Sequence, residues 1–178
     1  MKKIYVASLS LLVLFASCKK SNSTDNSVHF TCTVGGTAKT FNTGLIANKV
    51  VAYGVTTIDI HGISGATAGA EAFELQIDNA LSGDSIIAGN YTDTNTHFET
   101  DAVYDPNTSA LNSYEAGNGM AADAVNAGVT IKNHFTVHIT AIDAGSIRGT
   151  FSGDMFYNAD VSSTVKTVAS GDFYAKLQ

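Results

Sequence analysis

The feature that most constrains the fold is a strict alternation of apolar and polar residues near the C-terminus. Between Ser146 and Tyr157, one series holds Ile147, Gly149, Phe151, Gly153, Met155 and Tyr157, and the other holds Arg148, Thr150, Ser152 and Asp154. Successive side chains of a β-strand point to opposite faces of a sheet. The alternation therefore predicts a strand with Phe151 in the core and with Thr150 and Asp154 in solvent.

The same alternation recurs along the chain and predicts further strands. They are expected at residues 28–34, 50–55, 57–63, 71–78, 85–91, 129–142, 146–157 and 165–177. Gly35-Gly36 should form a hairpin turn before a return strand through Phe41. Residues 110–128 are rich in alanine but interrupted by glycine, so they form either a short helix near residues 120–126 or a long loop.

These elements predict an all-β fold. The chain has many short strands, a single proline and no sustained helical period. An antiparallel β-sandwich is the expected architecture, with an open β-barrel as the alternative.

The N-terminus has a charged start, an apolar run and a cysteine shortly after it. Two lysines precede an apolar run over residues 4–16, which is shorter than the ~20 residues needed to span a bilayer. The run ends in Leu-Phe-Ala-Ser-Cys18, which is similar to the lipobox that places a lipid-modified, palmitate-bearing cysteine first in the mature chain. The resemblance implies a signal peptide over residues 1–17 and lipidation of Cys18. The alternative is an ordinary secretory signal in which Cys18 is incidental.

A polar segment follows the cysteine. Residues 19–27 contain no apolar side chain, so residues 18–27 are interpreted as the lipidated cysteine and a flexible tether. Such a tether would keep the protein within ~30 Å of its anchor. Residues 28–178 are then expected to form a single β-sandwich domain.

The charge of the expected mature chain argues against two classes of partner. Without Lys2 and Lys3, 16 acidic and eight basic residues remain, for a formal charge of −8. Nucleic-acid binding depends on Lys and Arg neutralising phosphates, so no nucleic-acid partner is expected. Direct docking on anionic lipid is disfavoured for the same reason.

Five strand and turn segments carry a second resemblance: Phe30–Ala38, Ile87–Tyr91, Phe135–Asp143, Ile147–Gly153 and Gly171–Phe173. Together they resemble lipoprotein families of Bacteroidota that have no assigned function. The resemblance implies a β-sandwich lipoprotein of the outer membrane and supplies no catalytic residue. Many of these relatives carry an acidic run after the lipidated cysteine that directs export to the surface. Lys19-Lys20-Ser21 stands here instead, so a periplasm-facing and a surface-exposed location both remain open.

Two patterns could hold a metal ion. His134 and His138 lie about 13 Å apart on a strand, which is too far to share one ion without ligands from a neighbouring strand. Exposed strand histidines are the simpler interpretation. The acidic segment 93–101 offers Asp93, Asn95 and Glu99 as calcium ligands, but Phe98 replaces the glycine that an EF-hand loop needs. A solvated strand or loop with outward polar residues is therefore the default, and calcium the alternative.

No catalytic motif emerges, so neither an enzyme nor a cofactor is expected. Ser64 lies in Gly62-Ile63-Ser64-Gly65, where the second glycine comes one residue too early for a nucleophile elbow. Carboxylate pairs for glycoside hydrolysis leave no local signature, and nothing distinguishes the available glutamates, Glu71, Glu74, Glu99 and Glu115. Cys32 alternates with apolar residues and is interpreted as a buried side chain, with a reactive thiol as the alternative.

One modification motif is present. Ser85 lies in Asp84-Ser85-Ile86, which resembles the acceptor tripeptide for O-glycosylation in the same bacterial group.

These inferences favour a non-enzymatic envelope module that binds a glycan, a peptide or an envelope protein. A structural subunit of an outer-membrane complex and a glycan-directed hydrolase are the alternatives. The lack of tryptophan weakens the glycan hypothesis, although Tyr91, Tyr104 and Tyr114 are expected in or beside loops.

Overall fold

The computed structural model describes residues 27–178. The predicted signal peptide, Cys18 and all of the predicted tether except Ser27 lie outside the described residues. The described part contains eleven strands and one helix: β1 (His29–Val34), β2 (Thr37–Thr40), β3 (Thr43–Ala52), β4 (Val55–Ile63), β5 (Ala72–Asp78), β6 (Gly89–Thr92), β7 (Glu99–Asp105), β8 (Tyr114–Gly117), α1 (Asn118–Ala127), β9 (Thr136–Ile142), β10 (Ser146–Tyr157) and β11 (Val165–Lys176).

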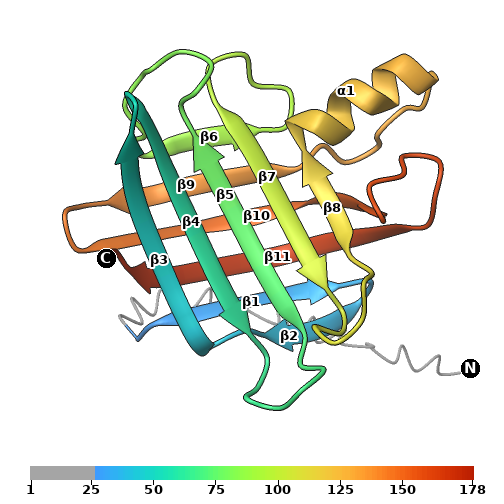
Figure 1. Ribbon diagram of the computed structural model, residues 1–178, viewed down its shortest axis with the longest axis horizontal. Coiled ribbons are helices and arrows are strands. Elements are labelled where there is room, and N and C mark those ends of the chain that lie inside the picture. Colours follow the sequence, from blue (N-terminus) through green and yellow to red (C-terminus); the bar gives the residue numbers. More distant parts are fainter. Residues whose placement is uncertain (1–26) are drawn as a thin grey trace, which may run out of the picture.

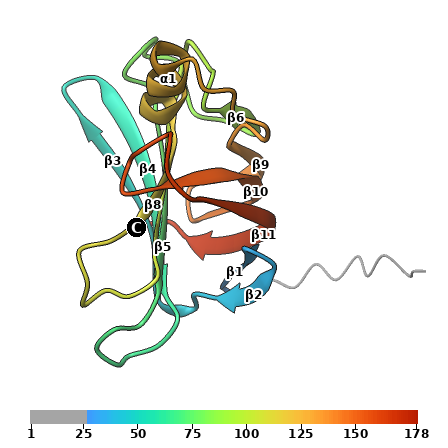
Figure 2. The same ribbon diagram turned by 90° about the vertical axis from the view of Figure 1, so that its right-hand side faces the viewer.

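All strands belong to one antiparallel sheet that curls into two layers (Figure 1). The front layer holds β3, β4, β5, β7 and β8, and the back layer holds β2, β1, β11, β10, β9 and β6. Strand β10 joins the layers, because it pairs with β9 over residues 147–152 and with β8 at Phe156 and Tyr157. Figure 2 shows the layers from the side. The all-β prediction is confirmed, and the curled sheet also fits the open-barrel alternative as a half-barrel.

The core lies between the layers and has a cluster of phenylalanine rings at its centre. The ring of Phe151 is central, with centroids 5.3 Å from Phe30 and 5.2 Å from Phe73. Phe151 is buried and Thr150 exposed, as the alternation predicts. Gly171, opposite Phe151 on β11, makes room for this ring, since a Cβ there would lie 2.6 Å from it.

The prediction that Asp154 faces solvent is wrong. A register irregularity between Phe151 and Gly153 interrupts the alternation, and every residue from Gly153 to Phe156 is buried. The chain after α1 covers what would be the wet face, because Phe156 packs in a second cluster with Ile131 and residues of α1.

Several element boundaries also differ from prediction. Strand β9 begins at Thr136, whereas residues 129–135 form a connection from α1. The segment predicted as strand 50–55 contains a turn at Tyr53-Gly54, where both φ angles are positive. Strand β6 begins only at Gly89, and β7 and β8 were not predicted.

Residues 110–128 contain a helix, as one of the two alternatives predicts. Its buried face consists of Met120, Ala121 and Ala124. Within residues 27–178, no helix combines the length and the apolar character needed to cross a membrane.

Candidate functional site

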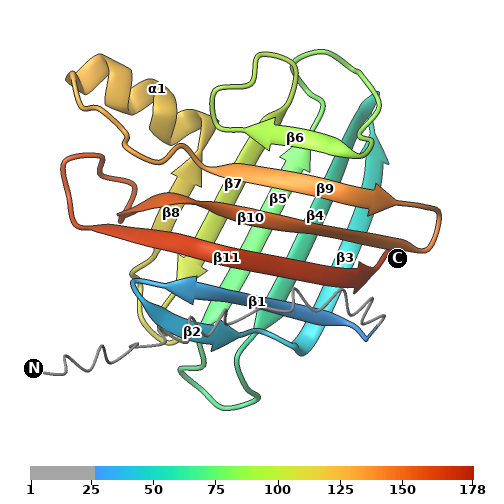
Figure 3. The same cartoon turned by 180° about the vertical axis from the view of Figure 1, so that it is seen from behind.

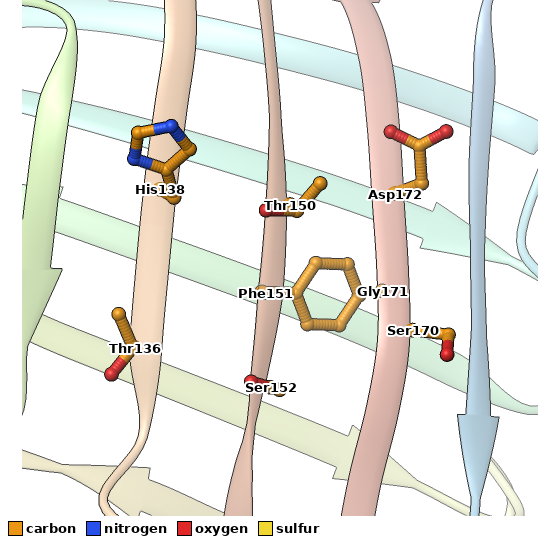
Figure 4. A pocket seen from close by; sticks show the side chains of 8 residues that line it. All are labelled: Thr136, His138, Thr150, Phe151, Ser152, Ser170, Gly171 and Asp172. Carbon is orange, nitrogen blue, oxygen red and sulfur yellow. The ribbon is translucent and has the colours of Figure 1, made fainter. Parts of the chain in front are cut away.

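The outer face of the back layer carries a hollow lined mostly by polar residues, which we call the central hollow (Figure 4). It has a volume of about 420 Å³ and spans three strands. Its lining consists of Thr136 and His138 of β9, Thr150, Phe151 and Ser152 of β10, and Ser170, Gly171 and Asp172 of β11.

Strand register places these polar side chains together. Thr150 pairs with His138 on one side and with Asp172 on the other, and Ser152 pairs with Thr136. Because alternate residues share a face, the outward positions of three neighbouring strands form one surface. Gly171 also lines the hollow, but it is an inward position of β11, where a Cβ would meet the ring of Phe151, so it presents only its backbone to this surface.

The side chains of His138 and Asp172, at the two sides of the central hollow, each form a polar contact with a neighbouring strand. Asn90 of β6 lies 2.7 Å from His138, measured from Oδ1 to Nδ1. Asp172 Oδ2 lies 3.2 Å from His29 Nε2. Within residues 27–178, no hydrogen bond occupies the hydroxyls of Thr150, Ser152 or Ser170. These three hydroxyls can therefore donate to a ligand and accept from it.

A second hollow of about 260 Å³ lies beside α1, and we call it the helix hollow. It is lined by Asp93, Thr94, Asn95, Asn118, Ala121, Ala122, Val125 and His134. Asp93 is almost fully buried here. Its Oδ1 lies 2.8 Å from His134 Nδ1, and its Oδ2 accepts a hydrogen bond of 2.8 Å from the backbone N–H of Phe135.

The three candidate calcium ligands are not brought together as a cation site. Asp93 binds His134 and Phe135 as described. Asn95 Oδ1 accepts the backbone N–H of His97 at 2.8 Å, closing a local turn. Glu99 lies on β7 in the front layer, opposite Asp78. Among residues 27–178, no group of three or more His, Cys, Asp or Glu side chains could hold a metal ion.

The outer face of the front layer is acidic, which fits the acidic surface that the sequence favours for its glutamates; the position of Asp101 among these carboxylates was not predicted. Burial, together with the nearby carboxylates of Glu99, Asp78 and Glu115, raises the pKa of Asp101 to about 6. Burial also raises the pKa of Asp59 and Glu74. The local signal for this position is that Glu99, Asp101 and Val103 alternate with residues of the core; residues 93–101 were interpreted as a solvated strand or loop.

Other candidates have structural roles. Ser64 Oγ accepts the backbone N–H of Glu71 at 2.9 Å, and Glu71 forms an ion pair of 2.6 Å with Lys39. Cys32 is buried as predicted, and burial raises the pKa of its thiol to about 12. Ser85 is exposed and, with Asp84, lines a hollow of about 490 Å³.

The expectation that three tyrosines are available in loops is wrong for two of them. Tyr91 and Tyr104 lie in β6 and β7 and are buried. Tyr114 is half-buried in β8, where its ring contacts Tyr157 and the ammonium group of Lys166. No aromatic platform for a sugar is therefore formed by these residues.

Comparisons with known proteins add no assignment. No family model matches the chain, and no curated protein or solved structure is significantly similar to it.

Proposed function

We propose that this protein is a non-enzymatic binding module of the cell envelope, held at the outer membrane by a lipid on Cys18, and that its central hollow binds a neutral glycan. The observation that carries the proposal is the group of three unoccupied hydroxyls on Thr150, Ser152 and Ser170 within one hollow. His138 and Asp172 lie at its two sides and add an imidazole and a carboxylate to the lining.

The chemistry of the central hollow favours a sugar over a peptide strand. The backbone groups of β10 are engaged in ladders with β9 and β11, so an extended peptide has no free edge to pair with at this surface. A ligand must therefore be recognised by side-chain hydroxyls. These can pair with sugar hydroxyls, because both kinds of hydroxyl donate and accept hydrogen bonds. The negative charge of the chain disfavours an anionic ligand.

The test is calorimetric titration of the full chain, purified in a detergent without a sugar headgroup, with a panel of neutral hexasaccharides. The panel comprises the hexamers of cellulose, laminarin, maltose, mannan, xylan and chitin. The key variant is Thr150→Val, which removes one hydroxyl at the centre of the hollow. Thr43→Val is the matched control, because Thr43 is an exposed threonine of β3 in the other layer.

We expect at least one hexasaccharide to bind and Thr150→Val to weaken binding about five- to tenfold, the effect of one lost hydrogen bond. Thr43→Val should leave the affinity unchanged. If no member of the panel binds, or if the two variants behave alike, the central hollow is not a glycan site.

A second candidate function, a subunit of an outer-membrane complex, is favoured by the β3–β4 hairpin. Val50, Val51 and Tyr53 are exposed apolar side chains at its tip. Exposed apolar groups that cluster in this way are typical of protein contacts. A photo-crosslinking residue at position 53 in intact envelopes should then give a discrete protein adduct. The same residue at Leu111, an equally exposed position in another loop, should give none.

A further inference from the structure

The two hollows lie along one stretch of chain, made of the end of the connection from α1 and the start of β9. Counting along the chain, His134, Thr136 and His138 alternate with Phe135 and Val137, both of which are fully buried. The three polar residues therefore share the outer face of the back layer. Thr136 and His138 line the central hollow and His134 lines the helix hollow, about 13 Å from His138 along an extended chain. Figure 3 shows how the connection from α1 leads directly into β9.

Asp93 fixes how His134 presents its ring. The side chain of Asp93 is 2% exposed, and the backbone of Phe135 anchors one of its oxygens independently of the histidine. A carboxylate oxygen only accepts hydrogen bonds, so Nδ1 is the donor in this contact, and a neutral imidazole would carry its one proton there. The lone pair then lies on Nε2, which has no hydrogen-bond partner within residues 27–178. Because 47% of the His134 side chain is exposed, a ligand can reach it.

The rest of the helix hollow is lined by apolar and polar residues together. Ala121, Ala122 and Val125 of α1 are apolar. Thr94, Asn95 and Asn118 are polar. A sugar ring has the same combination, since its C–H groups are apolar and its hydroxyls are polar.

We propose that the ligand is an oligosaccharide that runs along β9 from the central hollow to the helix hollow, where His134 Nε2 accepts a hydrogen bond from a sugar hydroxyl. This inference rests on the proposed function, because it takes the central hollow as the first subsite. It adds that the ligand is a chain of several sugars rather than a single unit, and it assigns His134 as a ligand contact.

A purely structural role for His134 makes a different prediction. Its bond to Asp93 could serve only to hold the start of β9, which Asp93 also binds through the backbone of Phe135. In that case the effect of removing the imidazole would be the same for short and long ligands. Dependence on ligand length therefore separates the two roles.

The experiment titrates the full chain with a length series, from monosaccharide to hexasaccharide, of whichever glycan binds the central hollow. The variant is His134→Ala. His97→Ala is the matched control, because His97 is also an exposed histidine held by a carboxylate, with Nδ1 3.1 Å from Asp84 Oδ2, and lines neither hollow. Nitrogen-15 spectra of the histidine rings are recorded with the disaccharide and with the hexasaccharide.

We expect affinity to rise with length beyond the disaccharide and His134→Ala to remove about five- to tenfold of the hexasaccharide affinity. Disaccharide binding should not change, and His97→Ala should affect neither ligand. The Nε2 resonance of His134 should shift with the hexasaccharide but not with the disaccharide.

The two proposals fail in different ways. Suppose that Thr150→Val weakens binding but the hexasaccharide binds His134→Ala and His97→Ala equally well. Then the ligand does not reach the helix hollow, and the central hollow alone remains the proposed glycan site. If affinity does not rise beyond the disaccharide, the same conclusion follows. If no glycan binds, or if Thr150→Val has no effect, the proposed function fails and the path fails with it.

Discussion

Asp154 of β10 binds Asn133 through both of its carboxylate oxygens. The backbone N–H of Asn133 donates to Oδ2 at 3.1 Å, and its side-chain amide donates to Oδ1 at 3.1 Å. The hydroxyl of Thr167 on β11 donates to the same Oδ1 at 2.7 Å. Together with Asp93, which binds His134 and Phe135, this carboxylate fixes the chain just before β9. Two buried acids thus determine where the candidate ligand residue His134 lies.

Replacing Asp154 with alanine should destabilise the protein by about 2–4 kcal/mol, because it leaves the donors of Asn133 and Thr167 without their charged acceptor. Asp123→Ala, at an exposed position of α1, should cost much less. Urea unfolding followed by circular dichroism measures both. Equal midpoints for the two variants would show that the Asp154 contacts contribute nothing to stability.

Phe151→Ala should cost about 3–5 kcal/mol, since it removes a ring packed against four other phenylalanines and leaves a cavity between the layers. Thr150→Ala, one residue away on the outer face, should cost less than about 1 kcal/mol. The comparison uses the same denaturant unfolding experiment. Two equally stable variants would contradict the register of β10.

The stability of the protein should depend on the ionisation of Asp101. Its pKa is about 6 in the folded protein, above the ordinary value near 4 in an unfolded chain. A carboxyl group with a raised pKa stabilises the fold below pH 4, and this contribution is lost as the pH rises through 6. Asp101→Asn, which stays uncharged, should therefore raise the melting temperature at pH 8 and change it little at pH 3.5.

The gain at pH 8 should correspond to about 1–2 kcal/mol, because solvent screens part of the repulsion from Glu99, Asp78 and Glu115. Asp123→Asn is the control, since it neutralises a carboxylate on α1, outside this acidic face. Calorimetric melts at the two pH values test the prediction. An equal effect of Asp101→Asn at both would rule out titration as its cause.

Cys18→Ser should release the protein from the membrane fraction, because the lipid that the sequence predicts on this residue would have nowhere to attach. Fractionation of envelopes followed by immunoblotting measures the release. Cys32→Ser serves as the control, because Cys32 is buried in the core and should not influence membrane association. A Cys18→Ser protein that still sediments with membranes would overturn the lipid-anchor assignment.

The sequence alone determined those features that depend on near neighbours. The alternation over residues 146–157 predicted the limits of β10, the burial of Phe151 and the exposure of Thr150. Gly35-Gly36 identified the first hairpin turn, where both φ angles are positive. Such signals are readable because side-chain direction in a strand and φ in a tight turn are set within a few residues.

Only the tertiary structure decided which distant residues meet. His138, Thr150 and Asp172 form one row because the register of β9, β10 and β11 aligns them, and Asp93 meets His134 across 41 positions. Asp154 looked solvent-exposed by alternation, but the connection from α1 covers it. The alternation of apolar and polar residues identifies a strand and its core face. It does not show whether another segment packs against the opposite face. The candidate site, the two buried acids and the gathering of carboxylates around Asp101 all arise from long-range pairing, which no local pattern encodes.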